Sequence, residues 1–100
     1  MMNKLIDKYD KMYNMIEISV VHKTFESEPI EVAKISVDKN LSLNQMLDKA
    51  FMLTNSINDA WWNNKDVECF KKTRSTMTGD QVIINGHTYE CMDNGWRSLG

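Results

Sequence analysis

The sequence predicts an α+β domain, with an antiparallel curled sheet of five or six strands, one main helix packed on it and a short N-terminal helix. Three observations support this prediction. Apolar and polar residues alternate with a period of two over much of residues 15–37. An amphipathic helical stripe covers residues 43–54. Two turn signals, Asn85-Gly86 and Asp93-Asn94-Gly95, divide residues 81–99 into short strands.

The composition is that of one small globular domain. The chain has 100 residues, of which 42% are hydrophobic, enough for a single modest core. Its formal charge is −2, with charges of mixed sign, whereas generic DNA binding needs clustered Lys and Arg. No apolar run reaches the roughly 20 residues of a membrane span, and residues 1–14 carry charges unlike a signal peptide. We therefore expect a cytoplasmic protein with reduced cysteines.

Residues 1–14 are expected to form an amphipathic N-terminal helix or extension, and residues 15–100 a single α+β domain. The apolar residues of the first segment recur at helical spacing, and charged residues fill the other face. These apolar residues are Leu5, Ile6, Tyr9, Met12 and Tyr13, followed by Ile16. A helix this short is marginal alone, so it must dock on another surface or fray.

Two strands are expected from Met15 to Val37. Ile16, Ile18 and Val20 alternate with their neighbours, which is typical of a half-buried strand. A turn closed by the chain's single proline follows, and the second strand pairs back as an antiparallel hairpin. Its alternation slips by one between Val32 and Ile35, which predicts a bulge near residues 33–34.

Ser42 begins the clearest helix, which we expect to end near Asn55. Gln45 stands three residues after Ser42, as a capping box requires, and Leu41 could pack onto Met46 as a hydrophobic staple. Beyond the helix, a short strand is expected around residues 67–71. Further strands are expected at residues 81–84, 88–92 and 96–99, separated by the two glycine turns.

The residues that could carry chemistry do not form a known motif. The zinc-ligand types are Cys69, Cys91, His22 and His87, but only His87 and Cys91 lie close in sequence, and zinc sites normally use tighter pairs. Asp66 and Glu68 are expected to face solvent rather than to form an acid–base pair. Gly79-Asp80 lacks the rest of a phosphate loop. We expect no catalytic residue, no metal and no cofactor, and thus no enzyme.

The segment from residue 60 to 78 is the expected partner-binding site. Adjacent Trp61 and Trp62 cannot both face one core from a regular element, so we expect one in the core and one exposed as an interaction anchor. The alternative is that both wedge into a loop beneath the helix. Lys71, Lys72 and Arg74 follow, and they are predicted either to surround a protein interface or to belong to a solvated turn.

From Leu43 to Leu99 the sequence resembles an uncharacterised family of small bacteriophage and plasmid accessory proteins. The residues that carry the resemblance are Leu47, Phe51, Thr54, Asn55, Trp61, Trp62, Asn64, Val67, Arg74-Ser75-Thr76, Thr78-Gly79-Asp80, Val82, Gly86, Tyr89, Gly95-Trp96 and Leu99. The resemblance implies a mobile-element origin and no particular activity.

The leading hypothesis is a non-enzymatic phage-type protein that binds a host or phage protein in the host-cell cytoplasm. Its role would be host takeover, or that of an accessory protein or inhibitor. The alternative is a nucleic-acid-binding module that uses Trp61, Trp62 and the cations Lys71, Lys72 and Arg74. A homodimer through a sheet edge or the N-terminal helix also remains open.

Overall fold

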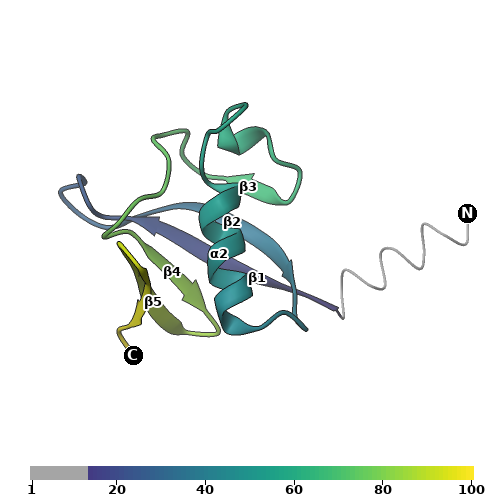
Figure 1. Ribbon diagram of the computed structural model, residues 1–100. Helices are drawn as coiled ribbons and strands as arrows, with labels where there is room; N and C mark the ends of the chain where they lie inside the picture. The colour runs from purple at the N-terminus through teal and green to yellow at the C-terminus, as the bar shows by residue number, and fades with distance from the viewer. Residues whose placement is uncertain (1–13) are drawn as a thin grey trace, which may run out of the picture.

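The computed structural model describes residues 14–100, and within them six strands form one antiparallel sheet in the order β3-β2-β1-β4-β5-β6 (Figure 1). The helix predicted over residues 1–14 lies, up to residue 13, outside the described residues. The elements are β1 (Met15–His22), β2 (Ile30–Asp38), α2 (Leu43–Leu53), the 3-10 helix η1 (Trp61–Asn63), β3 (Val67–Cys69), β4 (Gln81–Ile84), β5 (His87–Met92) and β6 (Gly95–Ser98).

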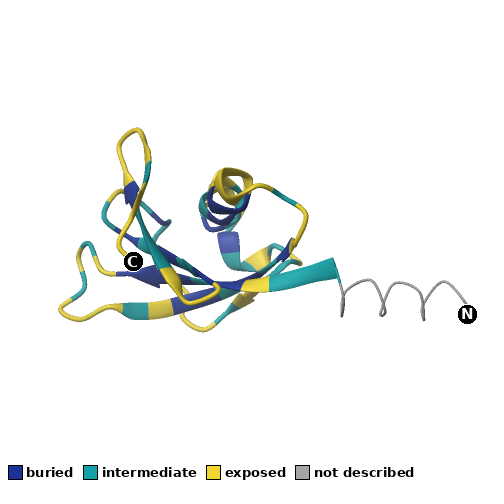
Figure 2. Ribbon diagram, turned by 90° about the horizontal axis from the view of Figure 1, so that it is seen from below, coloured by how far each residue is buried: buried dark blue, intermediate teal, exposed yellow. Residues whose placement is uncertain are grey.

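The main helix α2 lies on one face of the sheet, and the other face has no covering layer within the described residues (Figure 2). Apolar side chains of the central strands meet those of α2 in one core. Its members include Ile18, Val20, Ile35, Val37, Val82, Met46, Leu47 and Ala50. The period-two alternation of β1 and β2 therefore selects the face that α2 covers.

The predicted bulge is present, slightly earlier than expected. Val20 pairs with Ala33 and Val21 pairs with Glu31, so Val32 is the extra residue of β2. Val32 and Ala33 are consecutive and both buried. The break in alternation located the irregularity, but it did not identify which residue is unpaired.

The six antiparallel strands and the single main helix confirm the α+β prediction, whereas the predicted curl is wrong. The sheet is not strongly curled, and β3 and β6 remain as two separate edges. Between β1 and β2 there is a single register shift, and strong curvature normally needs several bulges or glycine kinks.

The start of α2 follows its sequence signals closely. The Ser42 hydroxyl accepts from the Gln45 backbone N–H at 3.2 Å, and Gln45 Oε1 accepts from the Ser42 N–H at 2.9 Å, which completes the capping box. Leu41 packs against the core beside it. The helix ends at Leu53 rather than Asn55, because the Thr54 hydroxyl donates to the Ala50 carbonyl at 2.7 Å and Thr54 leaves helical geometry.

A long connection closes one end of the two layers. Because the strands are antiparallel, β1 and β3 end where β2 and β4 begin, and we call this the loop end of the sheet. Residues 70–80 cross the loop end from β3 to β4 (Figure 1). The Thr76 N–H donates to the Thr54 carbonyl at 3.0 Å, which fastens this crossing to the C-terminus of α2.

The Asn85-Gly86 turn is confirmed as a two-residue hairpin loop. Both residues have positive φ, 50° and 80°, as the type I′ turn requires. Within residues 14–100, no helix has the length and apolar character needed to cross a membrane.

Candidate functional site

A buried carboxylate, Asp80, is the centre of a polar cluster at the loop end. Its oxygens accept six hydrogen bonds, although its side chain is 0% exposed. The donors are the backbone N–H groups of Lys23, Thr24 and Met77, the Thr24 hydroxyl and both terminal nitrogens of Arg74. This Asp80 cluster joins the loop of residues 23–29 to the crossing of residues 70–80.

Arg74 pairs with two carboxylates at once. Its Nη1 lies 2.7 Å from Asp80 Oδ2, and its Nη2 lies 2.8 Å from Glu26 Oε1. Hydrogen bonding to Asp80 raises the pKa of Arg74 above its ordinary value. Burial alone would raise the pKa of Asp80, but the hydrogen bonds from Arg74 and the backbone outweigh burial and hold it well below its usual range.

His22 lies beside this ionic pair in the protein interior. Its Nε2 lies 2.9 Å from the Thr76 hydroxyl and 3.9 Å from Asp80, while its Nδ1 has no hydrogen-bond partner among the described residues. Burial lowers the pKa of His22, and the attraction of Asp80 opposes this only in part. The ring is therefore neutral at pH 7.

Gly79 allows the two segments to approach closely. It occupies a turn in which the Asp80 N–H donates to the Met77 carbonyl at 3.0 Å, with φ of 95°. A Cβ atom at this position would lie 2.6 Å from the Thr24 hydroxyl oxygen. Any larger residue would therefore displace the Thr24 side chain, whose hydroxyl bonds to Asp80, and strain the turn.

The Asp80 cluster is suited to holding two loops in place rather than to catalysis. Both oxygens of Asp80 are occupied by donors, and His22 is 0% exposed, so a substrate reaches neither group. Within residues 14–100, no group of three or more His, Cys, Asp or Glu side chains is placed to hold a metal ion. The cluster holds the backbone N–H of Thr24 and the side-chain carboxylate of Glu26, which flank Phe25, whose side chain is 73% exposed.

The two tryptophans that were predicted to bind a partner differ in how deeply they are buried. Trp61 is 0% exposed in the core, and its indole N–H donates to the carbonyls of Thr73 and Arg74 at 2.9 and 3.2 Å. Trp62 packs edge-to-face on Trp61, with ring centroids 5.5 Å apart, and remains half-buried. The expected core tryptophan is Trp61, whereas Trp62 is half-buried, so neither is the exposed anchor that the sequence predicted. The hydrogen bonds of Trp61 fasten the crossing of residues 70–80 to the core.

The predicted cations also divide into two kinds. Lys71 and Lys72 are exposed, whereas Arg74 is held by Asp80 and Glu26. Two further exposed side chains, Phe25 and Phe70 (48% exposed), were not predicted as binding residues. The guanidinium carbon of Arg74 lies 5.3 Å from the Phe25 ring centroid, a cation–π arrangement. The sequence signal for Phe25 and for Phe70 was that each is a phenylalanine in a polar, turn-forming stretch.

The cysteines and His87 do not form a site. His87 is exposed, while Cys91 is buried and Cys69 half-buried, and both thiols are free. Burial raises the pKa of the Cys91 thiol, and nearby carboxylates such as Asp80 raise it further. The thiol is therefore protonated at pH 7 and is not an activated nucleophile.

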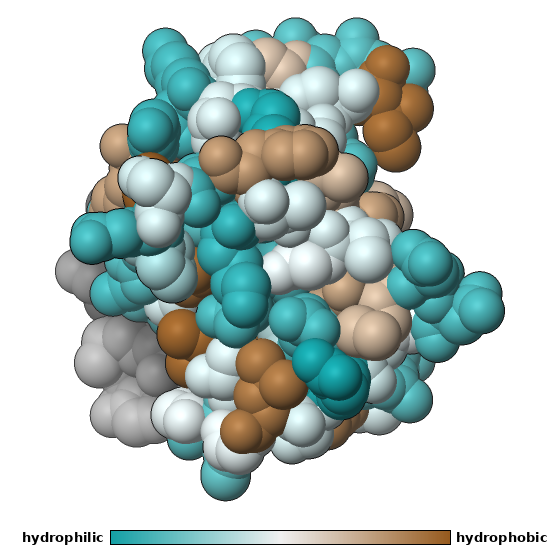
Figure 3. All heavy atoms as spheres, turned by 90° about the vertical axis from the view of Figure 1, so that its left-hand side faces the viewer, coloured by the Kyte–Doolittle hydropathy of each residue, from teal (hydrophilic) through white to brown (hydrophobic). Residues whose placement is uncertain are grey.

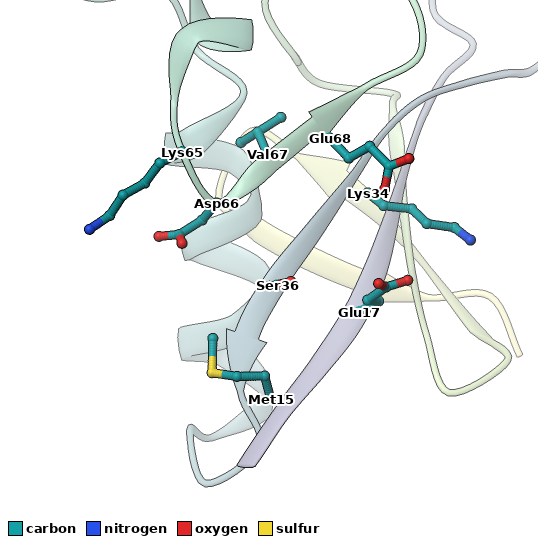
Figure 4. Close-up of a pocket in the computed structure, with 8 residues that line it drawn as sticks. All are labelled: Met15, Glu17, Lys34, Ser36, Lys65, Asp66, Val67 and Glu68. Carbon is teal, nitrogen blue, oxygen red and sulfur yellow. The ribbon is translucent and has the colours of Figure 1, made fainter. Parts of the chain in front are cut away.

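A shallow pocket of about 200 Å³ lies on the uncovered face of the sheet, over β1, β2 and β3 (Figure 4). It is lined by side chains of both charges: Glu17, Lys34, Lys65, Asp66 and Glu68, together with Met15, Ser36 and Val67. The ammonium groups of Lys34 and Lys65 point in opposite directions in Figure 4, so they do not converge on one anion. We assign this pocket no catalytic role.

Comparison with known proteins does not identify this chain. No family model, no curated protein and no solved structure matches it. The resemblance to phage and plasmid accessory proteins therefore stays a prediction. Several residues of that resemblance, among them Arg74, Gly79 and Asp80, form the cluster that fastens the crossing.

Proposed function

We propose that this chain is a non-enzymatic binding protein of phage or plasmid accessory type, which docks onto a host or phage protein in the bacterial cytoplasm. The observation that supports this most is the placement of Phe25. Its ring is 73% exposed, although the backbone beside it is tied to a fully buried carboxylate. The cation–π contact with Arg74 gives the fold only about 0.5–1 kcal/mol, whereas an exposed ring on a rigid support gives an interface a preformed anchor.

The binding surface that we infer consists of Phe25, Phe70, Lys71 and Lys72, and we call it the loop surface. All four side chains are exposed, and both segments belong to the loop end of the sheet. Figure 3, which views the side of the molecule that carries the loop of residues 23–29, shows hydrophobic atoms as separate islands among hydrophilic ones. Isolated aromatic anchors surrounded by polar groups are typical of transient protein interfaces.

The buried ion pair fits this function because it fixes conformation. A buried ion pair contributes little net stability compared with apolar packing, but breaking it is costly, so it favours one arrangement of its segments. Here that arrangement positions Phe25 against Arg74. Binding then does not require ordering of the loop, which would otherwise reduce affinity.

Nucleic-acid binding is the alternative, and the ion pairs weigh against it. Arg74 is neutralised by two carboxylates, which leaves Lys71 and Lys72 as the exposed cations of the loop surface. Two phosphate contacts give a weak and only mildly salt-dependent affinity. A protein with net charge −2 therefore has little electrostatic attraction to nucleic acid.

Differential capture from a bacterial lysate tests this proposal. The immobilised wild type, Phe25→Ala and Ile57→Ala would each be incubated with nuclease-treated and untreated lysate. Ile57 is the matched control, because it is 76% exposed but lies outside the loop surface. We expect one protein, retained after nuclease, to bind the wild type and Ile57→Ala but not Phe25→Ala.

Two results would contradict the proposal. Recovery of only nucleic acid, or of proteins that disappear after nuclease, would favour the nucleic-acid alternative, for which a salt titration is decisive. Equal capture by wild type and Phe25→Ala would remove the loop surface as the binding site.

A further inference from the structure

A second pocket lies on the helix-covered side of the sheet, between α2 and the β5–β6 hairpin. Its volume is about 180 Å³, and its lining combines two aromatic rings with two carboxylates. Phe51 and Asp48 come from α2, Trp96 comes from β6, and Asp93 comes from the turn between β5 and β6. Pockets that hold a drug-sized molecule normally exceed about 300 Å³, so this pocket suits a smaller group.

The two rings are fixed in a nearly perpendicular arrangement. The ring centroids of Phe51 and Trp96 lie 6.5 Å apart, with an interplanar angle of 83°. The Trp96 indole N–H also donates to Asp48 Oδ1 at 3.1 Å, which fastens β6 to α2. The lining is therefore held in place before any ligand arrives. Aromatic rings attract cations through their electron-rich faces.

Each carboxylate of the pocket keeps one oxygen free for a ligand. Asp48 Oδ1 accepts from Trp96, and Asp93 Oδ1 accepts from the Thr78 hydroxyl at 3.1 Å. Within residues 14–100, no hydrogen bond reaches the second oxygen of either carboxylate, and neither forms an ion pair. Lys49, which follows Asp48 on α2, does not line the pocket. Two like charges beside one cavity repel each other, so a cation between them is favoured.

The buried Cys91 thiol, which also lines the pocket, experiences this negative potential. Burial is the main cause that raises its pKa, and Asp80, Asp93 and Asp48 raise it further. Both carboxylates of the pocket therefore act on the same interior group, and their effects add.

We propose that this pocket binds a primary alkylammonium group, either at the end of a lysine side chain or on a free amine. The ammonium donates to the free oxygens of Asp48 and Asp93, and its alkyl chain packs against Phe51 and Trp96. The site shares no residue with the loop surface, so the proposal does not depend on partner binding there.

Other cations fit this lining less well. Hard metal ions such as Mg²⁺ and Ca²⁺ take about six or more oxygen ligands, whereas the pocket offers two carboxylates and two apolar rings. A guanidinium group prefers both oxygens of one carboxylate, and here one oxygen of each is already occupied. An ammonium group is a compact charge whose separate donors can reach two single oxygens.

A titration followed by NMR tests the site, with the Trp96 indole N–H signal as the reporter. The probe is n-butylammonium, and its matched neutral control is 1-butanol, which has the same chain length and no charge. We expect saturable shifts for n-butylammonium, with a Kd on the order of 1–10 mM, and none for 1-butanol. We expect n-butylguanidinium to bind more weakly than n-butylammonium.

Two variants remove the carboxylate charges without changing the shape of the side chain. Asp48→Asn keeps an oxygen for the Trp96 N–H, and Asp93→Asn keeps one for the Thr78 hydroxyl. We expect each variant to raise the Kd for n-butylammonium about two- to fivefold, and the double variant about tenfold. Glu31→Gln is the matched control, because it removes the same charge from an exposed position outside the pocket and should leave Kd unchanged.

A lysine blocked at both ends, Nα-acetyl-lysine N-methylamide, distinguishes the two sources of the ammonium group. Binding as tight as that of n-butylammonium would support a lysine side chain of another protein, whereas binding of n-butylammonium alone would support a free amine. Equally tight binding of 1-butanol would overturn the proposal, because the pocket would then recognise only the alkyl chain. Tighter binding of n-butylguanidinium, an unchanged Kd in the double variant, or no saturable shift with n-butylammonium would overturn it as well.

Discussion

Leu47 on the buried side of α2 and Asp80 at the loop end are hidden from solvent almost equally, 1% and 0% exposed, but different interactions hold them. Leu47 belongs to a cluster of apolar side chains whose burial is favourable in any well-packed arrangement. Asp80 depends on six named donors, from the loop of residues 23–29 and the crossing of residues 70–80. The core stabilises the fold, and the cluster fixes which conformation two loops adopt.

The core and the Asp80 cluster therefore differ in how well they tolerate substitution. Apolar cores accept other apolar residues of similar volume at modest cost. A buried carboxylate accepts no simple replacement, because each donor around it would be left unsatisfied. We expect substitutions in the core to lower stability gradually, and substitutions in the cluster to disorder the loop surface as well.

The largest effect is expected for Asp80→Ala. It removes the acceptor of three backbone N–H groups and one of the two carboxylates that pair with Arg74, and removing one partner of a buried pair costs about 3–5 kcal/mol. Denaturant unfolding would measure the loss. Asp66→Ala is the control, because its carboxylate accepts no hydrogen bond within residues 14–100, and we expect a change within about 0.5 kcal/mol. Equal stability of the two variants would show that the cluster contributes nothing.

A similar or somewhat smaller loss is expected for Leu47→Ala. Deleting a buried leucine side chain costs about 2–5 kcal/mol, depending on how far the cavity collapses. Amide exchange distinguishes the two variants more clearly than stability does. The Thr24 and Met77 N–H groups should stay protected from exchange in Leu47→Ala but not in Asp80→Ala. Loss of protection at Thr24 and Met77 in both variants, beyond the change in global stability, would mean that the core and the cluster are one cooperative unit.

The smallest effect is expected from pH, and it concerns the cluster alone. The folded state lowers the pKa of His22, so its contribution is fully present above the ordinary value near 6.5 and is lost as pH falls below it. The pKa values of Asp80 and Glu26 are also lowered, so their contributions are lost only in more acidic solution, below the usual carboxyl range.

Denaturant unfolding at a series of pH values from 8 to 5 checks this order. We expect the free energy of unfolding to fall with pH in the wild type and to fall less in His22→Gln. His87→Gln is the matched control, because His87 is exposed on the β4–β5 hairpin and its loss should leave the slope unchanged. The same slope in His22→Gln and the wild type would exclude His22 as the cause.

Most of the fold could be predicted because its signals are local. The capping box at Ser42, the Asn85-Gly86 turn and the alternation of β1 each depend on residues close in sequence. The order of strands in the sheet could not be predicted in this way. It places β4 beside β1 across a long stretch of chain, and no local pattern encodes that pairing.

The candidate site was predicted only in part, for the same reason. The exposed Lys71 and Lys72 and one core tryptophan follow from composition and spacing. The pairing of Arg74 with Glu26, 48 residues apart, does not. From the sequence alone, Arg74 is therefore predicted to be a surface cation and Phe25 a turn residue. Their contacts with each other and with Asp80 and Glu26 exist only because the fold places the loop of residues 23–29 beside the crossing of residues 70–80.

Local sequence signals were enough to predict the class of fold, the start of the helix, the positions of the hairpin turns and the residues that could be buried. Those properties arise from interactions over a few residues, where side-chain period and backbone preference decide the outcome. The burial of Asp80, the exposure of Phe25 and the position of β6 at the edge of the sheet were settled by the tertiary structure. Each of these depends on contacts between segments far apart in the chain, where packing and the satisfaction of buried polar groups outweigh local preference.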